Sequence, residues 1–320
     1  MRLLFRFSGE HHRLPEAELE GVLRGLGLRW RVVGREVSRN LLLIEVNSNS
    51  IDFVRRLALT HNVIEVVILD KRLGEIAKAV YPRIKNAKSF RVKSESNTIE
   101  KDLGALLHHK GLKVNLTRPE SVVSACRFKK KIAVGFEIPM EKNFDLRHPL
   151  KRPFFHPTSM KPKFARILLN LACLRAGDSV LDPFCGVGGI LIEAGLMGFK
   201  AYGLDVDKSM IYGSRKNLSF FNVDAVVERG DALGEISAKF DAIVTDPPYG
   251  KSSSTLGLSP GRLYNRFAAN ARKSLKKGSR LVVVLPSSYK LKHAGFRLED
   301  KFQVRIHKSL TRVIWILRKD

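Results

Sequence analysis

The segment DPFCGVGG, residues 182–189, decides the fold of the C-terminal half. It follows a short apolar stretch, Ser179–Leu181, that is typical of a strand, and it opens a predicted helix, Gly189–Met197. Glycines permit positive φ and let a ligand approach the backbone closely. The first turn of a helix also presents backbone N–H groups without partners. Since many strand-to-helix turns use glycine for geometry alone, the interpretation depends on the neighbouring elements.

Strands and helices alternate around this segment. Such alternation over about 150 residues predicts βαβ units and a mainly parallel sheet with helices on both faces. Two final strands, joined by a short connection, should form an antiparallel hairpin at the sheet edge. The predicted helices are Phe164–Leu174, Gly189–Met197, Lys208–Phe220 and Gly261–Leu275, and the predicted strands are Ser179–Leu181, Lys200–Leu204, Ala225–Glu228, Asp241–Thr245, Arg280–Leu285, Gln303–Ile306 and Thr311–Leu317.

Three acidic residues follow three of these strands. Asp205 comes about 20 residues after the glycine segment, where a dinucleotide fold places the carboxylate that binds a ribose diol. Asp182 and Asp231 follow two further strands. Each could simply cap a helix, but together at the carboxyl edge of a parallel sheet they predict one ligand crevice.

The segment TDPPYG, residues 245–250, follows the strand Ala242–Val244. Two prolines fix two φ angles and remove two donors, which leaves the Asp246 carboxylate and a backbone carbonyl as rigid acceptors. An exocyclic amino group needs such a pair, because its lone pair is delocalised until attack makes the nitrogen tetrahedral. Asp246 can take the released proton, and Tyr249 offers a face for base stacking. A simple proline turn with a capping aspartate is the alternative.

Charge identifies a class of partner. The 320 residues carry 57 Lys plus Arg against 31 Asp plus Glu, a net charge of +26 that is spread over both halves. Such an excess favours a polyanion, and nucleic acid fits better than a membrane because no basic amphipathic helix is evident. The three cysteines are far apart, so neither a disulfide framework nor a metal site is expected. Without a signal peptide or a membrane span, we expect a cytoplasmic protein.

The first half has a mixed pattern that indicates an α+β region, either one module or two in tandem. A basic stretch with four prolines, Asn143–Lys163, marks its end and should be an extended connector. It could be a solvated linker or could follow a phosphate backbone. The predicted strands are Leu3–Phe7, Arg31–Val33, Asn40–Val46, Ile64–Leu69, Phe90–Lys93 and Lys131–Phe136, and the predicted helices are Glu16–Leu23, Ile51–Leu59, Leu73–Ile84 and Ile99–Lys110.

The motifs of the second half resemble those of a known enzyme class. DPPY resembles the catalytic motif of amino-directed class I methyltransferases, and residues 182–189 resemble their S-adenosylmethionine loop. The resemblance implies a Rossmann-like fold; Val187, where relatives more often carry threonine, is a departure that should lose little hydrogen bonding. It assigns catalysis to Asp246, Pro247 and Tyr249, and cofactor binding to Thr158, Asp182, Phe184, Cys185, Gly186, Gly188, Asp205, Val206, Asp231, Ala232 and Asp246.

Shorter motifs relate the first half to RNA. FRVK at 90–93, KDLG at 101–104 and VNLTRPE at 114–120 resemble a THUMP domain, which recognises tRNA. A ferredoxin-like and THUMP region (1–142), a Pro-rich basic linker (143–160) and a methyltransferase domain (161–320) resemble the archaeal tRNA guanosine-10 N2-methyltransferase family, whose members can act with a small zinc-binding activator subunit. The residues expected to bind RNA are Arg91, Lys93, Arg118, Lys151, Arg152 and Lys161.

The resemblance implies methyl transfer from S-adenosylmethionine to N2 of a guanosine in tRNA, at position 10. The sequence leaves open whether one or two methyl groups are added. A guanosine elsewhere in tRNA or ribosomal RNA is the nearest alternative. A DNA amino-methyltransferase and a non-catalytic RNA-binding protein are more distant, since the first half is THUMP-like and Asp182, Asp205 and Asp246 are intact.

Overall fold

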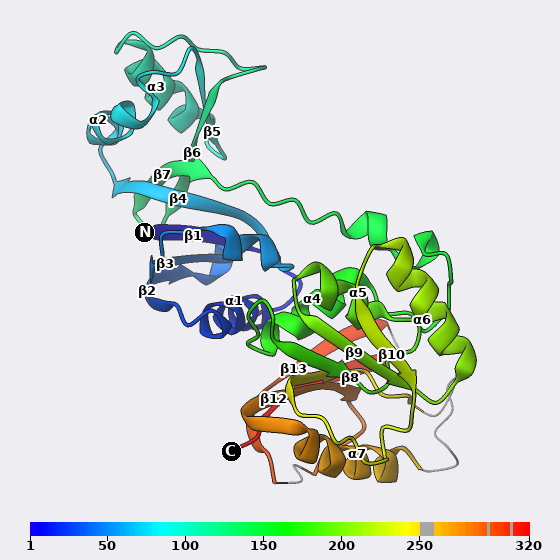
Figure 1. Ribbon diagram of the computed structural model, residues 1–320. Helices are drawn as coiled ribbons and strands as arrows, with labels where there is room; N and C mark the ends of the chain where they lie inside the picture. Colours follow the sequence, from blue (N-terminus) through cyan, green and yellow to red (C-terminus); the bar gives the residue numbers. More distant parts are fainter. Residues whose placement is uncertain (250–258, 293–294, 308–309) are drawn as a thin grey trace. The chain divides into compact units, whose positions relative to one another are not determined.

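The computed structural model describes residues 1–249, 259–292, 295–307 and 310–320 (Figure 1). The chain forms two compact units. Unit 1 comprises Met1–Glu10, Leu28–Arg55 and Leu59–Glu141, and unit 2 comprises His11–Gly27, Arg56–Ala58 and Lys142–Asp320.

Unit 1 is built on one seven-stranded sheet in the order β2-β3-β1-β4-β7-β6-β5. All neighbouring strands are antiparallel except β5 and β6, which run parallel. The strands predicted within residues 3–69 and those predicted within residues 90–136 thus join in a single sheet. The bounds are β1 Arg2–Phe7, β2 Arg29–Glu36, β3 Leu41–Asn47, β4 Thr60–Asp70, β5 Phe90–Ser94, β6 Ser121–Phe128 and β7 Lys131–Glu137.

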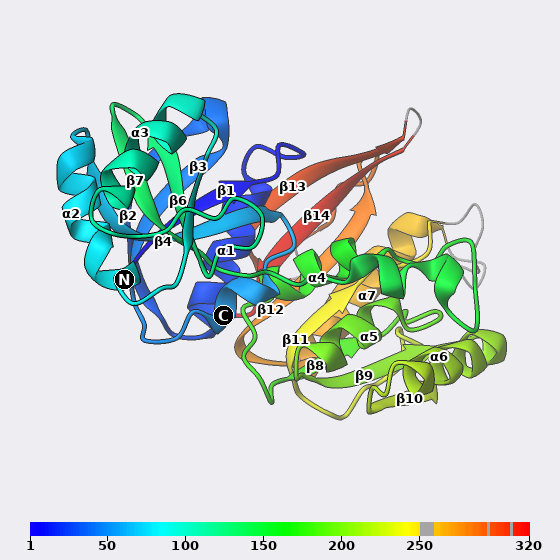
Figure 2. The same cartoon turned by 90° about the horizontal axis from the view of Figure 1, so that it is seen from above.

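Two helices pack on the half of this sheet that contains β5, β6 and β7. Helices α2 (Leu73–Ile84) and α3 (Asn97–His108) contact each other and bury an apolar cluster against these strands (Figure 2). The α+β character predicted for the first half is confirmed. The ferredoxin-like and THUMP arrangement itself stays a prediction.

Two expectations for the first half were wrong. The predicted helix Ile51–Leu59 is only a 3-10 turn, Asp52–Arg56. The helix does not continue because the backbone N–H of Ala58 donates to the buried Glu18 carboxylate, 2.8 Å away, instead of to a helical carbonyl. Strand β6 was not predicted; its Ser124 and Cys126 are buried among apolar residues and weaken the alternating pattern of a strand.

Unit 2 contains the predicted mainly parallel sheet, in the order β10-β9-β8-β11-β12-β14-β13. Strands β10, β9, β8, β11 and β12 run parallel to one another, β14 runs antiparallel to β12, and the β13–β14 hairpin is antiparallel at the edge, as expected. The bounds are β8 Ser179–Asp182, β9 Lys200–Asp205, β10 Ala225–Arg229, β11 Phe240–Thr245, β12 Leu275–Pro286, β13 Arg297–His307 and β14 Leu310–Arg318.

Helices cover both faces of this sheet. Figure 1 shows α7 on one face and α4, α5 and α6 on the other. Helix α1 (Leu14–Gly25) belongs to the same unit and contacts α4. Apolar residues of α7 pack against β11, β12 and β14 and form the main core beside the site. The other helices are α4 Pro162–Leu171, α5 Gly189–Leu196, α6 Lys208–Phe220 and α7 Pro260–Ser274.

The connector is folded against unit 2 rather than extended throughout. It contains two 3-10 turns, Phe144–Arg147 and Pro149–Lys151. Arg147 is buried, and its Nε donates to Glu193 of α5 at 2.6 Å. Arg166 of α4 donates to the same carboxylate at 2.8 Å, so two cations neutralise one fully buried acid. The expectation of an extended connector is therefore wrong for these turns.

Candidate active site

A cavity of about 830 Å³ opens at the carboxyl ends of the parallel strands of unit 2. Its size lies in the range of small-molecule sites. The glycine segment, the ends of β9 and β11, the Pro-rich connector and the edge hairpin all contribute residues. It is lined by His156–Met160, Asp182–Val187, Gly189, Ile190, Asp205–Asp207, Met210, Asp231, Ala232, Asp246–Tyr249, Leu263, Pro286, Ser288, Leu310 and Arg312.

The glycine segment, residues 182–189, leaves its backbone without side chains at Gly186, Gly188 and Gly189. Gly186 and Gly188 have φ of +50° and +84°, which other residues rarely adopt. A Cβ at Gly188 would lie 2.6 Å from the Ser214 hydroxyl of α6, so that position accepts only glycine. The Gly186 N–H donates to the Asp205 carboxylate at 2.9 Å, which ties this segment to the end of β9.

Asp182 is the most buried acid of the cavity, with 2% of its surface exposed. Its carboxylate accepts hydrogen bonds from the Thr245 hydroxyl (2.6 Å) and the Phe184 N–H (3.2 Å). Burial raises the pKa of Asp182 to about 7, and these two hydrogen bonds oppose the rise. A cationic ligand would therefore stabilise the ionised form of Asp182.

Two further acids lie along the cavity. Burial also raises the pKa of Asp205, whose oxygens accept from the N–H groups of Gly186 and Asp207. Asp231 is exposed and accepts from the Leu233 N–H at 2.8 Å. The three strand-end acids of the sequence thus line one cavity, as their positions predict.

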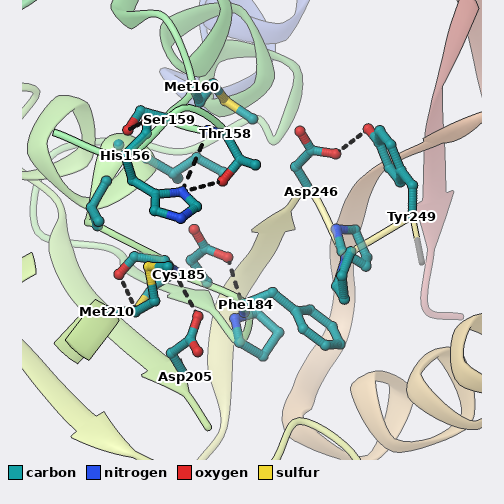
Figure 3. Close-up of a pocket in the computed structure, with 18 of the residues that line it drawn as sticks. His156, Thr158, Ser159, Met160, Phe184, Cys185, Asp205, Met210, Asp246 and Tyr249 are labelled. Atoms are coloured by element: carbon teal, nitrogen blue, oxygen red, sulfur yellow. Dashed lines mark hydrogen bonds between the residues drawn. The ribbon is translucent and has the colours of Figure 1, made fainter. Parts of the chain in front are cut away.

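The DPPY segment lies at the opposite side of the cavity from Asp205 (Figure 3). Tyr249 donates its hydroxyl to Oδ1 of Asp246, and Tyr264 of α7 donates to the Pro248 carbonyl at 3.0 Å. Tyr264 is almost fully buried, so this bond fixes the segment on the core. Burial raises the pKa of Asp246, whereas Arg312 and the Tyr249 hydroxyl lower it.

Arg312 is a site residue that the sequence did not reveal. It comes from β14, and its Nη1 lies 3.0 Å from Oδ2 of Asp246. Its guanidinium carbon lies 5.1 Å from the centre of the Tyr249 ring, a cation–π distance. No motif contains Arg312, and only the sheet topology brings it to Asp246.

The structure brings together most of the residues singled out from the sequence. Every residue expected to contact cofactor or substrate lines the cavity except Gly188, whose Cα faces Ser214. Cys185 is buried, and burial with Asp182 and Asp205 nearby raises the pKa of its thiol, which opposes a nucleophilic role.

The residues expected to bind RNA are not all accessible. Arg118, Lys151 and Lys161 are exposed, whereas Lys93 is exposed but lies 3.2 Å from Glu137. Arg91 is half-buried and donates to the Leu116 carbonyl. Arg152 is buried, and its guanidinium donates to the carbonyls of Arg147 and Met160, so its expected contact with RNA is not supported.

Comparison with known proteins identifies the family. A family model described as "RMKL-like, methyltransferase domain" matches residues 149–313. The chain belongs to this methyltransferase family. A protein of Methanothermobacter thermautotrophicus named tRNA (guanine(10)-N2)-dimethyltransferase is 36% identical to the methyltransferase over 341 residues, with 100% of both chains covered.

Two further comparisons cover most of the chain. A Pyrococcus abyssi protein of the same name is 35% identical over 301 residues, which cover 87% of the methyltransferase and 90% of that protein. The crystal structure of TrmN from Thermus thermophilus matches with a TM-score of 0.56 at 23% identity, over 100% of both chains, and supports the fold. Among the described residues, no helix has the length and apolar character needed to cross a membrane.

S-adenosylmethionine is the cofactor of the methyltransferase, and the residues present fit it. The glycine segment at Gly186 and Gly188 leaves room for a ligand against the backbone. Asp182 and Asp205 line the cavity with carboxylates, which are groups able to accept hydrogen bonds from an amine or from hydroxyls.

Proposed function

We propose that the methyltransferase transfers methyl groups from S-adenosylmethionine to N2 of guanosine 10 in tRNA, in the cytoplasm. The observation that carries the proposal is the Asp246 carboxylate, fixed by Tyr249 and Arg312 at the cavity that the glycine segment also lines. Relatives that are 36% and 35% identical carry the name of this activity.

The cofactor is proposed to lie along the carboxyl edge of the sheet. Asp182, with Thr158, Phe184, Cys185, Gly186 and Gly188 nearby, would hold the methionine part. Asp205 and Val206 would hold the ribose, and Asp231 with Ala232 the adenine. The order of these residues across β8, β9 and β10 supports the assignment, since neighbouring strands deliver neighbouring parts of one ligand.

The chemistry then depends on three residues of the DPPY segment. Bound S-adenosylmethionine supplies an electrophilic methyl group on a sulfonium, and sulfur keeps the electron pair of the broken C–S bond. Asp246 and the Pro247 carbonyl accept hydrogen bonds from the two N2 hydrogens and favour the tetrahedral nitrogen. Asp246 takes the proton that N2 loses when the N–C bond forms, while Tyr249 stacks on the flipped base.

RNA would be held by residues of both units. We propose the division 1–142 as RNA-binding, with ferredoxin-like and THUMP parts, 143–160 as linker and 161–320 as catalytic. Arg91, Lys93 and Arg118 of the first part, and Lys151 and Lys161 before α4, are the proposed RNA contacts. The net charge of +26 supports a polyanionic substrate.

A small zinc-binding activator subunit is a further proposed partner. Strand β13 is an edge strand, which offers unpaired backbone groups to another chain. Co-purification with such a subunit would support the proposal, and full activity of the isolated chain would contradict it.

The decisive experiment is methyl transfer from labelled S-adenosylmethionine to unmodified tRNA transcripts, followed by nucleoside analysis. We expect label in N2-methylguanosine or its dimethyl form, abolished by replacing guanosine 10 and by Asp246→Ala. The ratio of the two nucleosides shows whether the pocket accepts the monomethylated product. Label at another guanosine would refute the position but not the reaction. Relatives named tRNA (guanine(6)-N2)-methyltransferase, 28% identical over 54% of this chain in one case, make position 6 the first to check.

A further inference from the structure

Arg312 contacts two residues of the DPPY segment although it lies far from them in the sequence. It is on β14, where it pairs with Pro286 of β12 on one side and Val304 of β13 on the other. Both neighbouring strands hold its backbone in place. The side chain is 22% exposed and reaches into the cavity.

The contacts of Arg312 restrict the Asp246 carboxylate. Nη1 of Arg312 lies 3.0 Å from Oδ2, and the Tyr249 hydroxyl binds Oδ1. An ionised carboxylate has about four acceptor positions, so one bond to each oxygen leaves room for the amino hydrogens of a base. Two fixed donors thus set the plane of the carboxylate and leave some of its acceptor positions open.

The charges around Asp246 give Arg312 a second effect. Among the described residues, the other titratable groups that interact with Asp246 are Asp182 at the end of β8, Tyr264 of α7 and Tyr249 of the same segment, and none of these is cationic. Burial raises the pKa of Asp246, and Arg312 is the cation that opposes this rise. Nε of Arg312 is buried and has no hydrogen-bond partner among the described residues.

We propose that Arg312 is a positioning residue of the methyl transfer, which orients the Asp246 carboxylate and keeps it ionised so that it can accept the N2 hydrogens. This inference rests on the proposed function. Arg312 acts through Asp246 and has no bond to make or break. The contact from Arg312 to Oδ2 and the hydrogen bond from Tyr249 to Oδ1 together hold the carboxylate in one orientation.

A different role for Arg312, in which it competes with the base for Asp246, predicts different kinetics. A guanidinium that pairs with Asp246 beside Tyr249 resembles the N1–C2–N2 edge of guanine in shape and donors. Arg312 could therefore merely occupy the place of the base and leave when RNA binds. In that case its removal would lower KM for tRNA and leave kcat intact, whereas removal of a positioning residue lowers kcat.

The test compares Arg312→Ala and Arg312→Lys with the wild-type chain, using guanosine-10 tRNA transcripts from pH about 6 to about 9. Arg318→Ala is the matched control: Arg318 lies on the same strand, is more exposed and pairs with Glu299 instead of Asp246. Cofactor affinity, measured by calorimetry, shows whether each variant retains the fold of the site.

For Arg312→Ala we expect a loss of kcat of roughly 10- to 100-fold at neutral pH, with cofactor affinity unchanged. The loss should shrink as the pH rises, because the carboxylate that has lost its cation ionises at higher pH. Arg312→Lys should recover part of the activity, since it restores the charge but not the planar geometry. Arg318→Ala should behave as wild type.

Three results would overturn the inference: unchanged kcat in Arg312→Ala, a lower KM with kcat retained, or a loss of the same size at every pH. If the wild-type chain bound the cofactor but transferred no label to tRNA, even together with any subunit that co-purifies with it, the proposed function would fail, and the inference with it. The two failures are therefore distinguishable.

Discussion

Acidic residues behave differently in the two units. In unit 1, Glu45 of β3 is half-buried and lies between Arg31 and Arg2, and the hydrogen bond from Arg31 is the main cause that lowers its pKa. In unit 2, burial raises the pKa of Asp182, Asp205 and Asp246. An acidic side chain thus carries a stabilised charge at Glu45 and a costly charge in the cavity of unit 2.

The difference teaches how to separate a surface acid from a site acid. Glu45 already has its cations and needs nothing more, so it contributes little beyond solubility. The cavity acids are desolvated, and Asp182 and Asp205 are satisfied by hydroxyl and N–H donors rather than by cations. Acids that lose water without gaining a cation are candidates for ligand binding.

The largest effect should follow loss of the Asp246 charge. We expect Asp246→Asn to lower kcat by about 10² to 10³-fold, because the amide accepts no proton and offers one acceptor fewer. Asp241→Asn is the control on the same strand: its carboxylate lies at the other end of β11 and pairs with Lys276. Single-turnover transfer to tRNA measures the effect, and equal rates for both variants would remove Asp246 from the chemistry.

Asp205 should matter for binding rather than for the chemical step. Asp205→Ala removes the proposed acceptor of the ribose hydroxyls, so the Kd for S-adenosylmethionine should rise about 10- to 100-fold. Calorimetry checks this, with Asp224→Ala, an exposed acid before β10, as the control. A variant that binds as tightly as wild type would show that the ribose lies elsewhere.

The pH dependence of stability should reveal that the charge on Asp182 is costly in the folded protein. The pKa of Asp182 is raised from 3.8 to about 7, so the folded protein binds this proton more tightly than the unfolded chain does. Stability without cofactor should therefore fall as the pH rises from about 4 to about 7. Asp182→Asn should remove that dependence and stabilise the free protein above pH 7 by about 1 kcal/mol, since relaxation and water reduce the effect of burial. Denaturant unfolding at both ends of the range measures it, and parallel loss in both proteins would contradict the assignment.

The smallest effect should come from unit 1. Glu45→Gln removes two exposed ion pairs, and we expect no measurable change in the unfolding midpoint or in cofactor affinity. A thermal melt at low and high salt checks this. A clear destabilisation would mean that the ion pairs of Glu45 contribute measurably to the stability of unit 1.

The elements of the catalytic half were predicted well because each strand or helix there has a clear local pattern of apolar residues. Helix α6 begins and ends as expected, and β8, β9 and β11 differ by one residue at one end. Asp182, Asp205 and Asp246 could be placed at one edge because the carboxyl ends of parallel strands meet there. Strand β12 is longer than predicted because it begins directly after α7, with Gly278 at φ +80° within it.

What the sequence could not show depends on contacts between distant residues. Arg312 reaches Asp246 across 66 positions through the strand order, which no local pattern encodes. The expectation for Arg152 failed because a basic residue beside prolines looks solvated in sequence, whereas its guanidinium is bound by two carbonyls. Glu18 likewise ends a predicted helix from 40 residues away.

Thr245 and Asp246 are neighbours in the chain but contact different side chains. The Thr245 hydroxyl holds Asp182 beside the glycine segment, and Asp246 faces Tyr249 and Arg312. Successive side chains of an extended chain point to opposite sides. Deleting or inserting one residue near the end of β11 would therefore exchange the two directions and misplace both contacts at once. The length of this strand is constrained as strictly as its composition, and along β11 variants that change length should be far rarer than variants that change apolar side chains.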